Sequence, residues 1–329
     1  MSVEATVLVT IGMAAVGMAL AAEGAAPPKP AGKIPVILDT DIGGDIDDTW
    51  ALALILKCPE LDLKMVVSDT GDTVYRAKIA AKLLEVAGRT DVPVAIGLRQ
   101  KPMGTPQGPW VADYDLARYP GKVHQDGVAA LVDLIMSSPQ PLTLICIGPV
   151  PNIKAALDKQ PEIARRARFV GMHGSVRKGY NGGPTPQAEY NVKQDPKACQ
   201  AAFTAPWPVV ITPLDTCGIV RLKGDKYRRV AESADPIARA VIENYRIWWR
   251  AHNPNKPEKI DASSTLYDTV AVYLAFSTEL LNMERLPIRV TDDGFTREDP
   301  AGKPVDCALS WKNLGAFEDF LVERLTGGR

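Results

Sequence analysis

The sequence predicts an α/β fold in which a mostly parallel, open sheet carries helices on both faces. From Ile34 onward, short apolar runs alternate with amphipathic stretches of helix length. That alternation is typical of parallel strands joined by crossover helices. The first apolar run also ends directly in a cluster of carboxylates, and open α/β sheets bind ligands outside the carboxyl ends of their strands.

The individual elements follow in order along the chain. Residues 34–38 (IPVIL) are predicted to form a buried strand, with a helix after it at 48–57. A second strand is expected at 61–67 and a second helix at 73–88, where Gly88 ends it. The later strands are expected at 92–97, 142–148, 169–174 and 208–212, and the later helices at 127–138, 226–251, 268–276 and 313–325.

The N-terminal segment differs from the rest of the chain. Residues 7–21 form an apolar run of signal-peptide length that ends in the small residues of a cleavage site. Residues 22–33 follow as a Pro-rich, flexible lead. We therefore expect residues 1–33 to be a signal peptide and lead, and residues 34–329 to be one domain of an exported protein without a membrane span in its mature form. The start of the chain has Glu4 and no Lys or Arg, so an uncleaved anchor or a misassigned start is the alternative.

Composition limits the classes of partner. The net charge is −1, which provides no basic field for a phosphate backbone, so nucleic acid is not an expected partner. The five cysteines are odd in number and form no CxxC pair. Buried free thiols are therefore expected rather than a disulfide framework.

The strongest functional signal is the segment DTDIGGDIDD, directly after the first predicted strand. It holds five carboxylates, those of Asp39, Asp41, Asp45, Asp47 and Asp48. Crowded carboxylates repel one another and destabilise the fold unless a cation lies among them. Ligation by oxygen alone suits Ca²⁺ or Mg²⁺. A solvated acidic turn at a helix N-terminus is the alternative, but five aspartates after a buried strand favour a metal site.

Two other motifs share part of this pattern. An EF-hand loop requires a Glu at its twelfth position, where Trp50 stands. A haloacid-dehalogenase-type phosphatase also begins with DxD after a strand, but it does not predict the motifs that follow here.

With those later motifs, the chain resembles the inosine-uridine-preferring nucleoside hydrolases, whose opening motif is a strand followed by DxDxxxDD. The resemblance covers nearly everything after Ile34, and further blocks occur in the family's order: VVSDTGDTVYRAKIAAKLLEVAGRTDVPVAIG, HQDG, LTLICIGPVPNI, TPQAEYN and YDTVAV. It implies the nucleoside hydrolase fold and calcium-dependent hydrolysis of the N-glycosidic bond of a ribonucleoside to ribose and free base, in purine or pyrimidine salvage. The base preference and the oligomeric state stay open, with a homo-oligomer as one option.

The resemblance also implies roles at the metal. Asp41 matches the aspartate that binds calcium and activates the attacking water. Asp48 and Asp268 match the other carboxylate ligands, and Pro151 matches a residue that binds the ion through its carbonyl oxygen. Because the opening loop here is two residues longer than the family's, Asp45 is an alternative base.

Substrate contacts follow in the same way. Asp47, Glu189 and Asn191 match residues that bind ribose hydroxyls. Met172 matches a methionine that lies against the sugar, although ordinary core packing explains a methionine equally well. Asp72 aligns near a ribose-contacting asparagine.

The chain departs from the family at two places. A sugar-contacting asparagine falls at Gly183, and Asn181 is its nearest substitute. The histidine that protonates the leaving base in some members is Tyr267 here, so Tyr267 and His124 are the predicted leaving-group contacts. Aromatic side chains that could stack on a base are Trp110, Tyr245, Trp248 and Trp249, although core or interface packing is the commoner role of tryptophans in helices. These departures keep a second function open, that of a catalytically impaired, calcium-dependent nucleoside- or sugar-binding protein.

Overall fold

A ten-stranded sheet forms the centre of the computed structural model, which describes residues 1, 32–101 and 103–327. The strand order is β4-β3-β2-β1-β5-β6-β7-β10-β8-β9. β1 (Ile34–Thr40) pairs in parallel with β2 (Leu61–Ser68) on one side and with β5 (Leu142–Cys146) on the other. The remaining strands are β3 (Val94–Ile96), β4 (Val123–His124), β6 (Ala167–Met172), β7 (Val209–Thr212), β8 (Leu281–Val290), β9 (Thr296–Glu298) and β10 (Lys303–Trp311).

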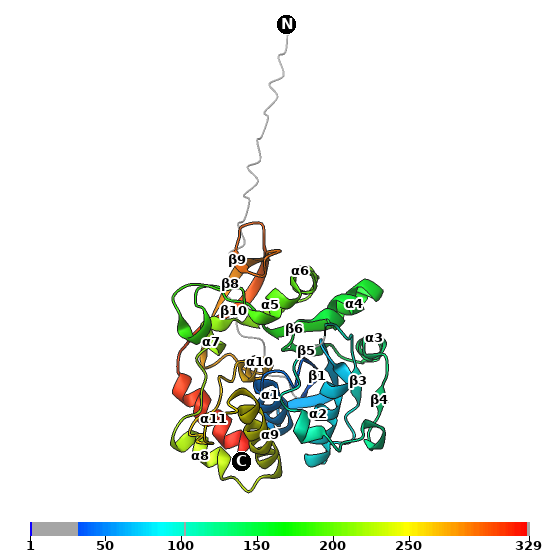
Figure 1. The fold of residues 1–329 in the computed structure, drawn as a ribbon. Coiled ribbons are helices and arrows are strands. Elements are labelled where there is room, and N and C mark those ends of the chain that lie inside the picture. The colour runs from blue at the N-terminus through cyan, green and yellow to red at the C-terminus, as the bar shows by residue number, and fades with distance from the viewer. Residues whose placement is uncertain (2–31, 102, 328–329) are drawn as a thin grey trace. The chain divides into compact units, whose positions relative to one another are not determined.

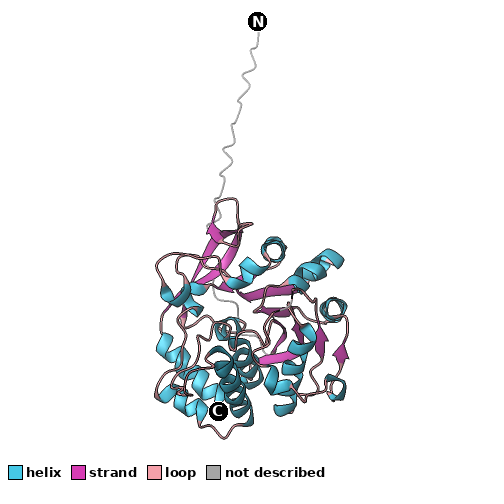
Figure 2. Ribbon diagram, viewed as in Figure 1, coloured by secondary structure: helices cyan, strands magenta, loops and turns pink. Residues whose placement is uncertain are grey.

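Helices cover both faces of this sheet (Figure 1 and Figure 2). Successive side chains of β1 point to opposite faces, as they do in any strand. Leu38 packs in one buried cluster with α1, α2, α9, α10 and α11, and Ile37 packs in the other with α3, α4 and α6. The predicted α/β class, with a mostly parallel open sheet and helices on both faces, is therefore confirmed.

The helices have the following bounds. They are α1 (Asp47–Lys57), α2 (Thr73–Val86), α3 (Gly127–Ser137), α4 (Pro151–Lys159), α5 (Tyr190–Gln194), α6 (Pro196–Thr204), α7 (Leu214–Cys217), α8 (Asp225–Ala231), α9 (Pro236–His252), α10 (Thr269–Leu274) and α11 (Leu314–Leu325). Short 3₁₀ helices are η1 (Gly108–Val111), η2 (Leu116–Arg118), η3 (Pro161–Arg165) and η4 (Tyr180–Gly182).

The sequence prediction omitted β4 and the helices α4 to α7, and two further parts of the fold also differ from it. The single helix expected at 226–251 is divided into α8 and α9. Asp235 caps α9 by accepting hydrogen bonds from the amides of Ile237 and Ala238, and Pro236 occupies the first helical position, where its missing N–H costs nothing. The antiparallel edge formed by β8, β9 and β10 was not predicted. Pro287 lies inside β8, and a proline within an apolar run argues against a strand.

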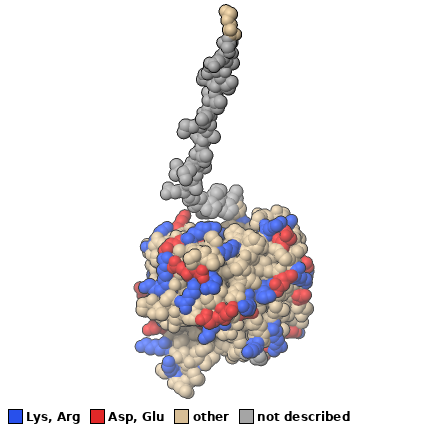
Figure 3. Space-filling view, turned by 90° about the horizontal axis from the view of Figure 1, so that it is seen from above, with Lys and Arg blue, Asp and Glu red and all other residues tan. Residues whose placement is uncertain are grey.

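Other sequence features have simpler outcomes. All five cysteines are buried and free, as predicted. Among the helices of residues 32–101 and 103–327, none has the length and apolar character needed to cross a bilayer. On the face drawn in Figure 3, basic and acidic side chains are interspersed. Apart from Met1, the predicted signal peptide lies outside the described residues, as does its lead up to residue 31.

Candidate active site

The loop between β1 and α1 places the aspartate cluster at the carboxyl edge of the central strand. The Thr40 hydroxyl accepts a hydrogen bond from the Ile42 amide at 3.1 Å and donates one to the Asp48 carboxylate. Gly43 adopts a φ of +102°, and a Cβ there would lie 2.8 Å from the side chains of Tyr75 and Ile79. Glycine is therefore required at this turn, which folds the acidic loop back over the strand.

Three of the carboxylates form a compact buried trio. Asp47 and Asp48 open α1, Asp268 directly precedes α10, and one oxygen of each lies within 4.8 Å of the others. Burial raises the pKa of all three carboxyls well above their usual range, and the charges of neighbouring aspartates raise it further. The N-terminal ends of two helices offset part of this repulsion. The repulsion that remains among the three carboxylates has to be offset by bound protons or by a cation.

Asp41 lies in the same cavity but not in this trio. Its carboxylate faces Arg76 of α2, with 3.8 Å between Oδ2 and Nη2. Arg76 is almost fully buried, and it donates hydrogen bonds to the carbonyls of Ile42 at 3.0 Å and Thr70 at 2.8 Å. Burial raises the pKa of Asp41, and the Arg76 guanidinium opposes that rise. Arg76 therefore favours the ionised form of Asp41, a contact that the sequence analysis missed.

Buried polar side chains behind the aspartate cluster, Asn152 and Asp69, hold the end of β1 in place through hydrogen bonds. Asn152 donates from its side-chain amide to Asp39 Oδ2 at 2.8 Å and to the Ser68 carbonyl at 3.1 Å. Asp69 Oδ2 accepts from the Val150 amide at 3.2 Å. Burial raises the pKa of Asp39 to about 6, while the hydrogen bonds from Asp69 and Asn152 oppose the rise. Asp69 and Asn152 lie in the later motifs, and nothing in the sequence alone indicates that they support the opening loop.

Across the cavity, the predicted sugar contacts Glu189 and Asn191 lie side by side and are buried. Glu189 caps α5: its carboxylate accepts from the amides of Asn191 at 2.8 Å and Gly174 at 2.9 Å. The Asn191 side-chain amide donates to the carbonyls of Ile147 at 3.1 Å and Met172 at 3.0 Å. Burial raises the pKa of Glu189 to about 7, and its three backbone hydrogen bonds oppose that rise. These bonds fix the orientation of both side chains before any ligand binds.

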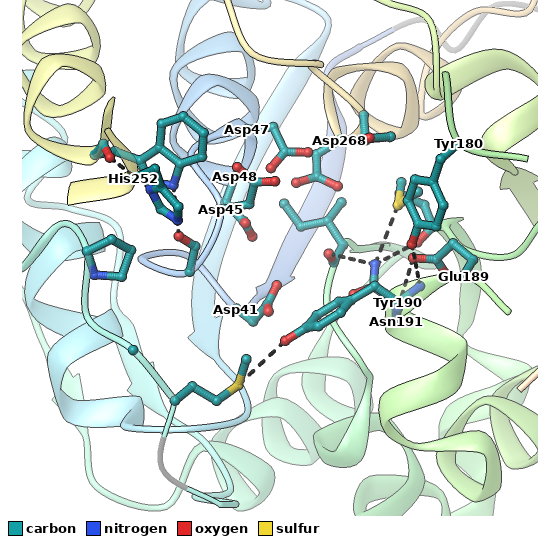
Figure 4. Close-up of a pocket in the computed structure, with 18 residues that line it drawn as sticks. Asp41, Asp45, Asp47, Asp48, Tyr180, Glu189, Tyr190, Asn191, His252 and Asp268 are labelled. Atoms are coloured by element: carbon teal, nitrogen blue, oxygen red, sulfur yellow. Dashed lines mark hydrogen bonds between the residues drawn. The ribbon is translucent and has the colours of Figure 1, made fainter. Parts of the chain in front are cut away.

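One cavity of about 530 Å³ brings these groups together (Figure 4). Asp41 and the trio face Glu189 and Asn191 across the cavity. Met172 also lines it, with its sulfur 3.5 Å from the Asn191 side-chain nitrogen. This volume fits a ligand of nucleoside size, since small-molecule sites span roughly 300–1,000 Å³.

The structure places the other predicted residues as follows. Tyr267 lines the cavity and packs edge-on against Tyr180, with 6.2 Å between ring centroids. His124 lies in β4 and is not among the residues that line the cavity. Asp72 caps α2 through the Tyr75 amide, and it does not line the cavity either. Pro151 opens α4 just after β5, the strand beside β1.

Comparison with known proteins decides the family. Residues 36–312 match the sequence model of the inosine-uridine preferring nucleoside hydrolases. The chain belongs to this family. The resemblance inferred from the opening aspartates and the later motifs is thereby confirmed, and the chain is an N-glycosyl hydrolase of the nucleoside hydrolase class.

Relatives and solved structures agree with this assignment. A pyrimidine-specific ribonucleoside hydrolase of Salmonella arizonae is 30% identical over 313 residues, which cover 89% of this chain and 98% of the relative. One from an Enterobacter species is 31% identical over 242 residues, 68% of this chain and 73% of the relative. A plant nucleoside hydrolase superposes with a TM-score of 0.76 at 24% identity, covering 91% of this chain and 99% of that one. A purine-preferring ribonucleoside hydrolase from Gardnerella vaginalis gives 0.72 at 23% identity, covering 89% and 98%. The nucleoside hydrolase fold is thus shared across the sheet and its helices.

We predict that the trio makes the stability of this nucleoside hydrolase depend on pH and on cations together. Without a cation, the raised pKa values of Asp47, Asp48 and Asp268 mean that the folded protein keeps protons which the unfolded chain loses above about pH 4. Unfolding then releases protons, so the free energy of unfolding falls as pH rises. A bound cation replaces those protons. The gain in Tm on adding Ca²⁺ to chelator-treated protein should therefore be larger at pH 8 than at pH 5. A gain independent of pH would contradict this account of the trio.

Proposed function

We propose that this nucleoside hydrolase uses Ca²⁺ to cleave the N-glycosidic bond of a ribonucleoside, giving ribose and the free base. The observation that carries the proposal is the pairing, across one cavity, of a buried carboxylate trio with the oriented Glu189 and Asn191. Asp48 and Asp268 of the trio, together with Asp41, supply a cation site, and the opposite wall supplies acceptors for sugar hydroxyls.

The donor set fits a hard divalent cation. The trio offers carboxylate oxygens and no nitrogen or sulfur. In our proposal, Asp41, Asp48, Asp268 and the carbonyl of Pro151 hold the ion. Ca²⁺ suits such a set better than Mg²⁺, because it accepts six to eight oxygen ligands in irregular geometry and takes backbone carbonyls readily. When bound, the ion supplies positive charge that offsets the aspartates and makes a neighbouring water more acidic.

The chain's own residues account for the other requirements of the reaction. As the base departs, positive charge develops on the ribose ring, and carboxylates close to the ring favour that charge. Asp47, Glu189 and Asn191 orient the sugar through its hydroxyls, and Met172 packs against it. Asp41 accepts a proton from the attacking water, a role that requires its ionised form. Arg76 favours that form.

Asp41 and Asp45 are the two candidates for the base, and the structure gives them different surroundings. Asp41 is buried against Arg76, whereas Asp45 lines the cavity as an exposed residue. We expect Asp41→Asn to lower kcat for ribose release by roughly 100-fold or more while the fold persists. Asp45→Asn is the matched control and should lose far less.

Ribose release from inosine and uridine measures both variants, and Ca²⁺ added after chelation should restore the wild type. An inactive Asp45→Asn beside an active Asp41→Asn would reverse the assignment of the base. Full wild-type activity after exhaustive chelation would contradict the proposed dependence on calcium.

The sugar-hydroxyl contacts give a second prediction. Glu189→Gln and Asn191→Ala should lower kcat/KM on ribonucleosides more than on 2′-deoxyribonucleosides, which lack one of the bound hydroxyls. Both side chains also make local backbone hydrogen bonds. The Tm of each variant therefore has to be measured to exclude general unfolding. Equal losses on the two classes of sugar would argue against hydroxyl binding by these residues.

We also propose that the chain is exported and that the mature protein begins near Ala22, on the basis of the apolar run at 7–21. N-terminal sequencing of the protein from its native host tests this directly. A chain that keeps Met1 in the cytosol would contradict it.

A further inference from the structure

The end of α9 builds a part of the cavity that neither the cation site nor the sugar contacts use. Trp248 and His252 are four residues apart and therefore share one face of this helix, and both line the cavity. Figure 4 shows His252 and Asp45 on one side of the cavity, with Tyr180, Glu189 and Asn191 on the other. A nucleoside whose ribose lies against Glu189 and Asn191 would extend its base toward this wall.

This wall is held in place by contacts to the acidic loop. The indole N–H of Trp248 donates to the Gly44 carbonyl at 3.1 Å, and the Trp248 ring packs on Tyr245 with centroids 5.9 Å apart. The side chain of Gln107 donates to the Asp45 carbonyl at 2.8 Å and accepts from Asn244 of α9 at 2.7 Å. The position of α9 is therefore fixed relative to the loop that carries Asp41.

His252 is oriented by two contacts to Trp248. Its ring lies 4.3 Å from the Trp248 ring, centroid to centroid, and its Nδ1 lies 2.9 Å from the Trp248 carbonyl oxygen. Because a carbonyl oxygen only accepts, Nδ1 must carry the hydrogen, which leaves Nε2 as the nitrogen that gains and loses a proton.

The surroundings of His252 suit a group that must exchange protons. The side chain is exposed, so the imidazole can be reprotonated from solvent. Asp45 is exposed as a residue, yet its carboxylate is partly desolvated. This desolvation raises the pKa of Asp45, and the charge of His252 opposes the rise. The Asp45 carboxylate in turn attracts a protonated imidazole. The nearby Arg250 is paired with Glu258 at 2.7 Å.

We propose that His252 donates the proton that the leaving nucleobase takes up. The inference rests on the proposed hydrolysis. The bond between the sugar C1′ and the base nitrogen breaks, and its electron pair goes to the base. Nε2 of the imidazolium gives its proton to the base, and water adds to C1′ while losing its proton to Asp41. Asp41 then releases its proton to solvent and His252 regains one from solvent, so both groups return to their starting forms and the cycle requires no other reactant.

The alternatives are less suited to this step. All three histidines of the chain lie within the described residues, and His252 alone among them lines the cavity. His173 is buried, and its Nε2 bonds the Gly148 carbonyl at 3.0 Å. Burial raises the pKa of Tyr267 to about 12, so its hydroxyl gives up a proton reluctantly at neutral pH. Tyr267 is thus better suited to a contact with the substrate.

The test compares His252→Gln with the wild type on inosine, uridine and p-nitrophenyl riboside. Nitrophenolate leaves without a proton, whereas the natural bases need one. We expect His252→Gln to lower kcat/KM by about 100-fold on inosine and uridine, the usual contribution of a general acid, and to leave the nitrophenyl substrate nearly unchanged. Glu243→Gln, on the exposed side of the same helix, is the matched control and should behave as the wild type.

Each other outcome has a definite meaning. Equal losses on all three substrates would overturn the proposal and indicate that His252 shapes the cavity without donating a proton. Unchanged activity on inosine and uridine would overturn it too, and a selective loss in Tyr267→Phe would then make Tyr267 the donor. A wild type that cleaves p-nitrophenyl riboside in the presence of Ca²⁺ upholds the proposed function even where the role of His252 fails. A wild type that cleaves none of the three contradicts both.

Discussion

Electrostatic repulsion among buried carboxylates is the constraint on which the rest of this site depends. Asp47, Asp48 and Asp268 place their oxygens within 4.8 Å of one another where water does not screen them. Such an arrangement persists only if opposite charge or bound protons offset it. Two helix N-termini and the Thr40 hydroxyl contribute, and Arg76 contributes next to Asp41. These groups offset only part of the repulsion among the carboxylates, and the remaining negative charge favours a divalent cation. The fold of the loop and the chemistry of the site therefore have one physical origin.

Three different parts of the fold line the cavity, and each contributes side chains of a different kind. The loop after β1, together with the start of α10, carries the acids, and the segment from β6 to α5 carries the side chains that we propose as acceptors for a sugar. The end of α9 carries the wall toward which the base would point. Each group is held by backbone hydrogen bonds or by packing, as with Glu189 at the start of α5 and Trp248 on Gly44. This preorganisation lets binding energy orient the substrate rather than order the protein.

The sequence predicted what local pattern and order of motifs determine. The opening aspartates, the sheet class and the cavity position of Asp268, Glu189 and Asn191 all followed from short motifs. Arg76, Asn152 and His252 were not anticipated, because the residues that they contact or face lie far away in the chain. Arg76 and Asn152 lie inside recognised motifs, but the motifs do not indicate these contacts. The Asp235-Pro236 pair indicates the break between α8 and α9. The antiparallel edge could not be predicted in the same way, because Pro287 argues against a strand where β8 lies. Contacts between distant elements, more than the elements themselves, are what a single sequence fails to reveal.

The central claim is that Asp48 and Asp268 of the trio, together with Asp41, hold a cation. Calorimetric titration of chelator-treated protein with Ca²⁺ tests it most directly, with Asp48→Asn as the altered site and Asp62→Asn, an aspartate of β2 away from the cavity, as the control. The account predicts one ion per chain for the wild type and for the control, and much weaker binding for Asp48→Asn. Wild-type protein that binds no Ca²⁺, or an Asp48→Asn variant that binds it as tightly as the wild type, would contradict the account.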